Sequence, residues 1–204
     1  MKRLLSGLIV GTAMLITACG QSPQPSSPTP TPTPTSTPRE TPLHLLIPSL
    51  NIDSSIESVG TVAQGQLDAG KEKCSDAGGC MQVPSTLANV AWYQPGVAPA
   101  QDGDAVIAGH KDNVQGAHGV FWSLGSMKVG DEVDVTTQTG HKLIFKVTSN
   151  QTVSSTANTN QIGLFATSGQ PRLTLITCTG AVNASRTAYL QRLIVDTSYQ
   201  RMTS

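Results

Sequence analysis

Short apolar and alternating runs, separated by Gly, Pro, Asn and Asp, fill the chain from residue 43 onward. Alternation of apolar and polar positions is typical of a half-buried strand, and the longer period of an amphipathic helix is rare here. The sequence therefore predicts a β-rich domain. The expected strands cover residues 43–47, 52–59, 105–110, 132–137, 142–148, 173–178 and 192–195.

Turn-forming residues organise these strands. Pro48 ends the first strand, because proline has no backbone N–H to donate to a sheet. A Thr-Gly pair at residues 139–140 joins the strands on either side as a hairpin, which places His141 near an exposed tip. Residues 119–124 are expected to form one short helical turn. With strands at this density and no long helix, the pattern predicts a closed barrel or a sandwich.

Residues 1–18 have the pattern of a secretion signal. Lys2 and Arg3 form a basic start, residues 4–16 are apolar, and a small-residue region closes on Cys19. The arrangement resembles a bacterial lipoprotein signal, in which the cysteine becomes the acylated first residue of the mature protein. An uncleaved transmembrane helix is the alternative, although the apolar stretch is shorter than the roughly 20 residues that span a bilayer. We predict lipidation at Cys19 and a membrane anchor.

Residues 19–42 are expected to form a tether. Proline alternates with Thr and Ser through most of this stretch, and almost no apolar side chain is present to be buried. Polyproline-type chain advances about 3.1 Å per residue, so some twenty residues would lift a domain roughly 60 Å from a lipid surface. Generic disorder or a glycosylated stalk are alternatives, and each would still act as a spacer.

Residues 43–204 are enough for one domain with a sizeable core and too few for two. The formal net charge is zero and no basic cluster follows Arg3, which argues against a nucleic-acid partner. The four histidines and four cysteines lie scattered, without the close pairing of a zinc site. We therefore expect neither a metal nor another cofactor.

Two predicted strands each end in a reactive side chain, His110 and Cys178, and a later strand begins with Arg192. Together they supply a proton-transfer partner, a nucleophile and an anion stabiliser. Residues 174–178 are TLITC, and with the order His, Cys, Arg they resemble the TLxTC signature of the sortase family. The resemblance covers nearly all of residues 43–197 and implies an eight-stranded β-barrel with the active site at one end. The surroundings of His110 and Cys178 look most like sortase classes E and F.

The resemblance also implies a mechanism, that of a cysteine transpeptidase. Cys178 would attack the Thr–Gly bond of an LPxTG-like sorting signal, His110 would protonate the departing amine, and Arg192 would stabilise the oxyanion. An amine acceptor, either a cell-wall precursor or a pilin lysine, would then take the acyl group. Thr177 is expected to orient the strand end or to contact the substrate. Such an enzyme would act at the extracytoplasmic face of the bacterial cell membrane.

Neighbouring residues leave alternatives for two of these roles. His118, among glycines, is the rival to His110, and Arg186, in a polar loop, is the rival to Arg192. Arg192 is preferred because it directly precedes an apolar strand, as the family's arginine commonly does. Asp112 is a candidate for steering the imidazole, on class-level resemblance alone.

If Cys19 is acylated and Cys178 stays a thiol, Cys74 and Cys80 remain as a pair. An oxidising exterior favours a disulfide between them, and a loop this short gains roughly 2 to 2.5 kcal/mol from the bridge. Two reduced loop thiols are the alternative. For the whole protein, two other functions stay open: a secreted cysteine hydrolase that uses water, and a non-catalytic surface-binding lipoprotein.

Overall fold

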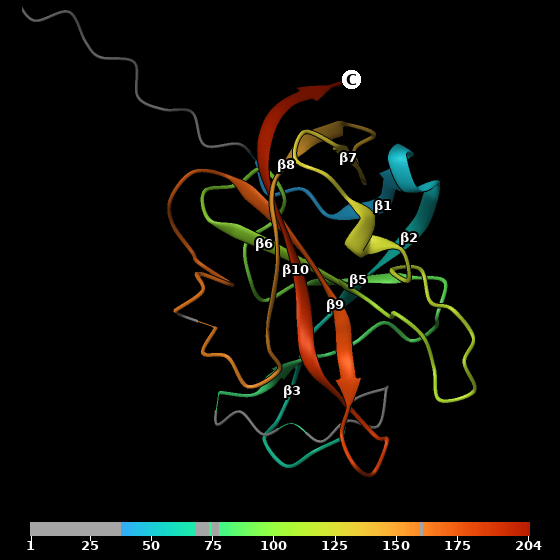
Figure 1. The fold of residues 1–204 in the computed structure, drawn as a ribbon. Helices are drawn as coiled ribbons and strands as arrows, with labels where there is room; N and C mark the ends of the chain where they lie inside the picture. The colour runs from blue at the N-terminus through green and yellow to red at the C-terminus, as the bar shows by residue number, and fades with distance from the viewer. Residues whose placement is uncertain (1–37, 68–73, 75–77, 160) are drawn as a thin grey trace, which may run out of the picture. The chain divides into compact units, whose positions relative to one another are not determined.

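The structure, a computed structural model, describes residues 38–67, 74, 78–159 and 161–204. Within these residues, eight strands close into a barrel in the order β1-β2-β5-β6-β9-β10-β8-β7, and β3 pairs separately with β4 (Figure 1). The barrel strands are β1 (Pro42–Ile47), β2 (Ile52–Val59), β5 (Val90–Tyr93), β6 (Asp104–Gly109), β7 (Glu132–Thr137), β8 (Lys142–Ser154), β9 (Arg172–Val182) and β10 (Tyr189–Thr203). The short pair is β3 (Thr61–Val62) and β4 (Cys80–Met81). This confirms the predicted eight-stranded barrel.

Alternation along the strands sets the inner face of the barrel. In β2, Ile52, Ser54 and Ile56 are buried, while the residues between them are exposed. The buried apolar side chains of the barrel strands form one core cluster, which includes Leu45 and Leu175 at 0% exposure. Burial of this apolar surface is the main force that closes the barrel.

Helix is limited to two 3-10 turns within the described residues, η1 (Pro48–Leu50) and η2 (Leu124–Ser126). The first begins at the proline that ends β1, as the pattern indicates. The helical turn predicted over 119–124 is displaced, because only its last residue belongs to η2.

Strands β8, β9 and β10 are longer than their apolar runs predict (Figure 1). The ladder between β9 and β10 continues past the apolar segments, with Thr179 opposite Gln191 and Val182 opposite Tyr189. Cys178 therefore lies inside a strand, and the prediction that it stands at the strand tip is wrong. Backbone hydrogen bonds hold this extension together, and they leave no hydrophobic pattern in the sequence.

The hairpin of β7 and β8 turns at Gly140, whose φ of 87° suits glycine. His141 lies at the hairpin end, as predicted, but its Nδ1 is 2.7 Å from Oε1 of Glu40. Partial burial acts to raise the pKa of Glu40, but hydrogen bonds from Thr137, Thr139 and His141 lower it overall. An ionised Glu40 thus attaches the start of the barrel to this hairpin.

The predicted signal peptide, Cys19 and most of the tether lie outside the described residues, so these remain predictions. Across the described ranges, the structure contains no helix that is long and apolar enough to span a membrane.

Candidate active site

Strand register brings Cys178 and Arg192 together. Arg192 on β10 lies directly opposite Cys178 on β9 in an antiparallel ladder. Side chains opposite each other in such a ladder share one face of the sheet, with their Cβ atoms about 4.5 to 5.5 Å apart. Both residues are half-buried. The thiol and the guanidinium are therefore neighbours, although fourteen positions separate them in sequence.

His110 lies on the other side of β9, level with Cys178 and Arg192, and these three residues are called the reactive row. Strand β6 runs parallel to β9, with Ala108 opposite Ile176. Continuing that register by two residues brings His110 level with Cys178. The hydroxyl of Thr177, which is buried, donates a hydrogen bond of 2.7 Å to the carbonyl of Gly109 and fixes the end of β6 there. Thr177 thus acts as a clamp between the strands that present the histidine and the cysteine.

The three side chains line one cleft of about 870 Å³, and Thr177 contributes to the same lining. Ala108, Ile176 and Ile194 occupy the next row on this face and form an apolar floor. Reactive groups at one end of an apolar surface suit an extended peptide whose scissile bond lies over the thiol.

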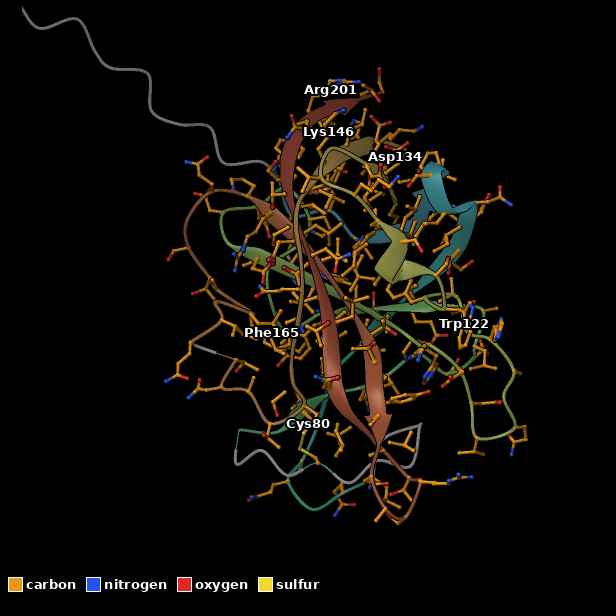
Figure 2. The ribbon with its side chains drawn as sticks, viewed as in Figure 1. Cys80, Trp122, Asp134, Lys146, Phe165 and Arg201 are labelled. Atoms are coloured by element: carbon orange, nitrogen blue, oxygen red, sulfur yellow. A yellow bond between two sulfur atoms is a disulfide. The ribbon has the colours of Figure 1, made fainter. Side chains whose placement is uncertain are left out.

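Two chain segments, each with a strand portion, line the sides of the cleft. One comes from residues 153–159 together with Ile162, Leu164 and Phe165, and the ring of Phe165 meets Tyr93 edge-on with centroids 5.0 Å apart. The other comes from Cys74 and residues 78–84. The predicted disulfide between Cys74 and Cys80 is present in this wall. In Figure 2, Cys80 and Phe165 lie on one side of the paired strands β9 and β10 and Trp122 lies on the other.

The imidazole of His110 is oriented by the backbone. Its Nε2 is 2.9 Å from the carbonyl oxygen of Pro84. A carbonyl only accepts, so Nε2 carries the proton and donates it, which leaves Nδ1 as the nitrogen that exchanges a proton with other groups. Neither Pro84 nor its loop shows a sequence signal that would have predicted this contact.

Arg192 is also held by carbonyl groups. Its Nη1 donates to the carbonyl of Tyr189 at 3.0 Å and to that of Gln191 at 3.2 Å. The rival arginine lies elsewhere: Arg186 is exposed in the turn between β9 and β10, with a φ of 56°. The structure places Arg192, and not Arg186, at the cleft.

The other histidines have different neighbours. The ring of His118 is exposed and stacks on Trp122, with centroids 3.6 Å apart. His44 binds Asp53, with Nε2 and Oδ1 2.7 Å apart. Neither residue belongs to the lining of the cleft.

Asp112 accepts a hydrogen bond of 2.7 Å from the hydroxyl of Tyr189. Burial, this hydrogen bond and the nearby charges of Asp112 and Cys178 raise the pKa of Tyr189 to about 12. The Lys111 ammonium lies over the rings of Tyr189 and Trp122, at 4.7 and 5.3 Å from their centroids. These contacts fix the loop that follows His110 to the start of β10. Of the residues that make them, the sequence analysis had singled out only Asp112.

The sequence model of the family described as "Sortase domain" matches residues 45–200. The chain belongs to the sortase family. Among solved structures, it is similar to sortase C1 of GBS pilus island 1, with 18% identity and a TM-score of 0.54 over 80% of this chain and 65% of that one. It thus spans just under two thirds of that relative.

Two further structures show the same fold. A sortase D5 transpeptidase from Clostridium perfringens matches with 19% identity and a TM-score of 0.53, over 79% of each chain. Sortase C-1 from Actinomyces oris matches with 21% identity and a TM-score of 0.51, over 78% of this chain and 73% of that one. Comparison with curated protein sequences finds no match.

Proposed function

We propose that this sortase is a cysteine transpeptidase that uses Cys178, His110 and Arg192. The observation that carries the proposal is the single row across β6, β9 and β10, in which the three side chains line one cleft. A nucleophile, a proton-transfer group and a cationic donor over an apolar floor are the parts that acyl transfer from a peptide requires.

In the proposed reaction, the Cys178 thiolate attacks the carbonyl carbon of the scissile peptide bond. The negative charge moves to the carbonyl oxygen, where the Arg192 guanidinium donates hydrogen bonds. The C–N bond then breaks as His110 gives a proton to the leaving amine, and a thioester remains on Cys178. An incoming amine, deprotonated by the same histidine, attacks the thioester carbonyl, and the C–S bond breaks to release the Cys178 thiolate.

We propose that the donor is an LPxTG-like sorting signal, cleaved between Thr and Gly, and that the acceptor is a cell-wall precursor or a pilin lysine. The apolar floor under the reactive row supports an extended donor with apolar side chains.

We further propose that the protein is closest to class E and F sortases and works at the extracytoplasmic face of the membrane, tethered through acylated Cys19. The disulfide in the cleft wall supports an oxidising compartment.

The test is transfer of a fluorescent LPxTG-type peptide to an added amine, followed by separation of the transferred and hydrolysed products. We expect transfer to exceed hydrolysis when the amine is present. His110→Ala should lose about 10² to 10⁴ in rate, because it removes the general acid and base. His118→Ala, in a histidine stacked on Trp122 outside the cleft, is the matched control and should stay near the wild-type rate.

Product hydrolysed by water at every amine concentration would instead identify a cysteine hydrolase. Absence of both products for every donor tested would favour the non-catalytic binding protein. A larger loss in His118→Ala than in His110→Ala would move the proton-transfer role to His118.

A further inference from the structure

Glu57 on β2 binds the segment that continues from one wall of the cleft. Its Oε2 accepts the backbone N–H of Ser85 at 3.0 Å, and its Oε1 accepts the Ser85 hydroxyl at 2.8 Å. Oε1 also accepts the side-chain amide of Asn89 at 2.7 Å. One carboxylate therefore holds both ends of the short segment 85–89.

This segment is joined directly to the group that orients the imidazole. Pro84, whose carbonyl accepts the His110 Nε2–H, immediately precedes Ser85. With two hydrogen bonds on Ser85, the Glu57 carboxylate sets where the Pro84 carbonyl lies. The position of the His110 ring thus depends on a residue two strands away in the barrel order.

Glu57 also acts on His110 through its charge. Partial burial acts to raise the pKa of Glu57, but hydrogen bonds from Asn89 and Ser85 and the charge of His110 lower it overall. The carboxylate is thus ionised at neutral pH. Among the described residues that line the cleft with His110, the other charged side chain is the Arg192 guanidinium, which is a cation.

We propose that Glu57 is a positioning residue for His110, which holds the Pro84 carbonyl against Nε2 and stabilises the imidazolium that protonates the leaving amine. The inference rests on the proposed transpeptidase function. In the step concerned, the S–C bond to Cys178 forms and the C–N bond breaks. The proton on Nδ1 passes to the amine nitrogen, which leaves a neutral imidazole. Because Glu57 touches neither substrate nor thiol in this step, its effect passes entirely through His110.

The test compares two donors that differ only in the leaving group: the LPxTG-type peptide amide and a matched thioester. An amine must receive a proton to depart, whereas a thiolate departs without one. The rate of acyl-enzyme formation is measured in a single turnover without amine, because the later transfer step uses His110 for both donors. We expect Glu57→Gln in the full chain to lower this rate about tenfold or more for the amide, with little change in the donor concentration that gives half the maximal rate, and to leave the rate for the thioester within about threefold. Glu57→Asp, which keeps the charge, should recover part of the loss.

Asp53→Asn is the matched control, because it also neutralises a carboxylate on β2. Asp53 binds His44 and does not bind the cleft wall. It should behave like the wild type on both donors, after subtraction of the background seen with Cys178→Ala. Equal losses of Glu57→Gln on the two donors, or no loss on either, would overturn the inference.

If Glu57→Gln does not fold, Ser85→Ala decides, because it removes one hydrogen bond to the carboxylate and leaves the charge in place. A loss confined to the amide donor supports the inference, and unchanged rates contradict it. A wild-type protein inactive on both donors would refute the proposed function itself, which is a different result from an active wild type with an unaffected Glu57→Gln.

Discussion

Cys178 lies between the two side chains that are proposed to act with it. Arg192 stands opposite it across the ladder, and His110 stands level with it on the other side. Neighbouring cations stabilise a thiolate, which is the nucleophilic form. Because each neighbour is itself fixed by a backbone carbonyl, the row is arranged before any substrate binds.

Arg192→Lys tests the role of the guanidinium. Lysine keeps the positive charge but lacks the planar fork that contacts two acceptors at once, so we expect at least about a tenfold loss of kcat/KM in peptide transfer. Arg186→Lys, in the exposed turn, is the control and should leave kcat/KM unchanged. An impaired Arg186→Lys beside a normal Arg192→Lys would show that the wrong arginine was assigned.

For single residues, the sequence predicted which reactive side chains lie in the cleft, but it did not predict the residues that hold them in position. The TLITC segment and the strand before His110 mark the thiol and the imidazole directly. Pro84 and Glu57 are an ordinary loop proline and an ordinary strand carboxylate, and only the folded chain places them next to His110. Contacts of this kind leave no local pattern, because they join segments distant in sequence.

Among the elements, β6, β9 and β10 share a buried polar cluster away from the reactive row. Asp104 is 1% exposed, and its Oδ1 accepts a 2.7 Å hydrogen bond from the hydroxyl of Thr174. Its Oδ2 lies 3.4 Å from the Arg172 guanidinium. Burial outweighs these favourable contacts, and the neighbouring charge of Asp196 adds to its effect, so the pKa of Asp104 is raised to about 6.

The raised pKa of Asp104 predicts a pH-dependent stability. The folded state binds the Asp104 proton more tightly than the unfolded chain does. The contribution of this proton to the free energy of unfolding is therefore fully present below about pH 3.8 and is lost as pH rises through about 6. The loss is on the order of 3 kcal/mol. Asp104→Asn cannot titrate and should lack this part of the slope when denaturant unfolding is measured between pH 4 and 7.

The informative quantity is the difference between wild type and Asp104→Asn in how the free energy of unfolding changes with pH, because Glu40 and Glu57 titrate in both proteins. Their lowered pKa values act in the opposite direction, because they add stability above the ordinary glutamate range that is lost as pH falls through the lowered value. Parallel pH dependence in wild type and Asp104→Asn would contradict the assignment.

The strand ends show where pattern reasoning stops at the level of elements. The apolar cores of β9 and β10 were predicted, but their polar extensions beyond Cys178 and before Arg192 were not. These extensions are held by ladder hydrogen bonds between exposed and half-buried residues. Hydrophobic periodicity reports burial and is silent on a solvated ladder, so the position of Cys178 within its strand could not be deduced.

For the molecule as a whole, the described chain begins attached to the barrel. Arg39 donates to the carbonyl of Gln94 at 2.6 Å, and its guanidinium lies 5.2 Å from the Trp92 ring centroid. Glu40, the next residue, binds His141 at the β7–β8 hairpin, and neither Arg39 nor Glu40 lines the cleft. We therefore expect the proposed anchor and the proposed catalysis to be separable.

Cys19→Ala tests the proposed anchor. We expect the variant to leave the membrane fraction of cells while keeping full peptide-transfer activity, because stable anchoring requires the acyl chains that the cysteine receives. Cell fractionation and a transfer assay on each fraction measure the two effects. Retention of the variant in the membrane would identify residues 4–16 as an uncleaved helix and leave the transpeptidase proposal untouched.

The central claim is that Cys178 carries the acyl group between donor and acceptor. Incubation of the full chain with an LPxTG-type peptide in the absence of amine, followed by intact-mass measurement and mapping of the modified fragment, tests it most directly. We predict an adduct of the acyl part of the peptide on Cys178 that disappears when an amine is added, and no adduct on Cys178→Ala. Acyl transfer by Cys178→Ala, or an adduct on any other residue, would contradict the account.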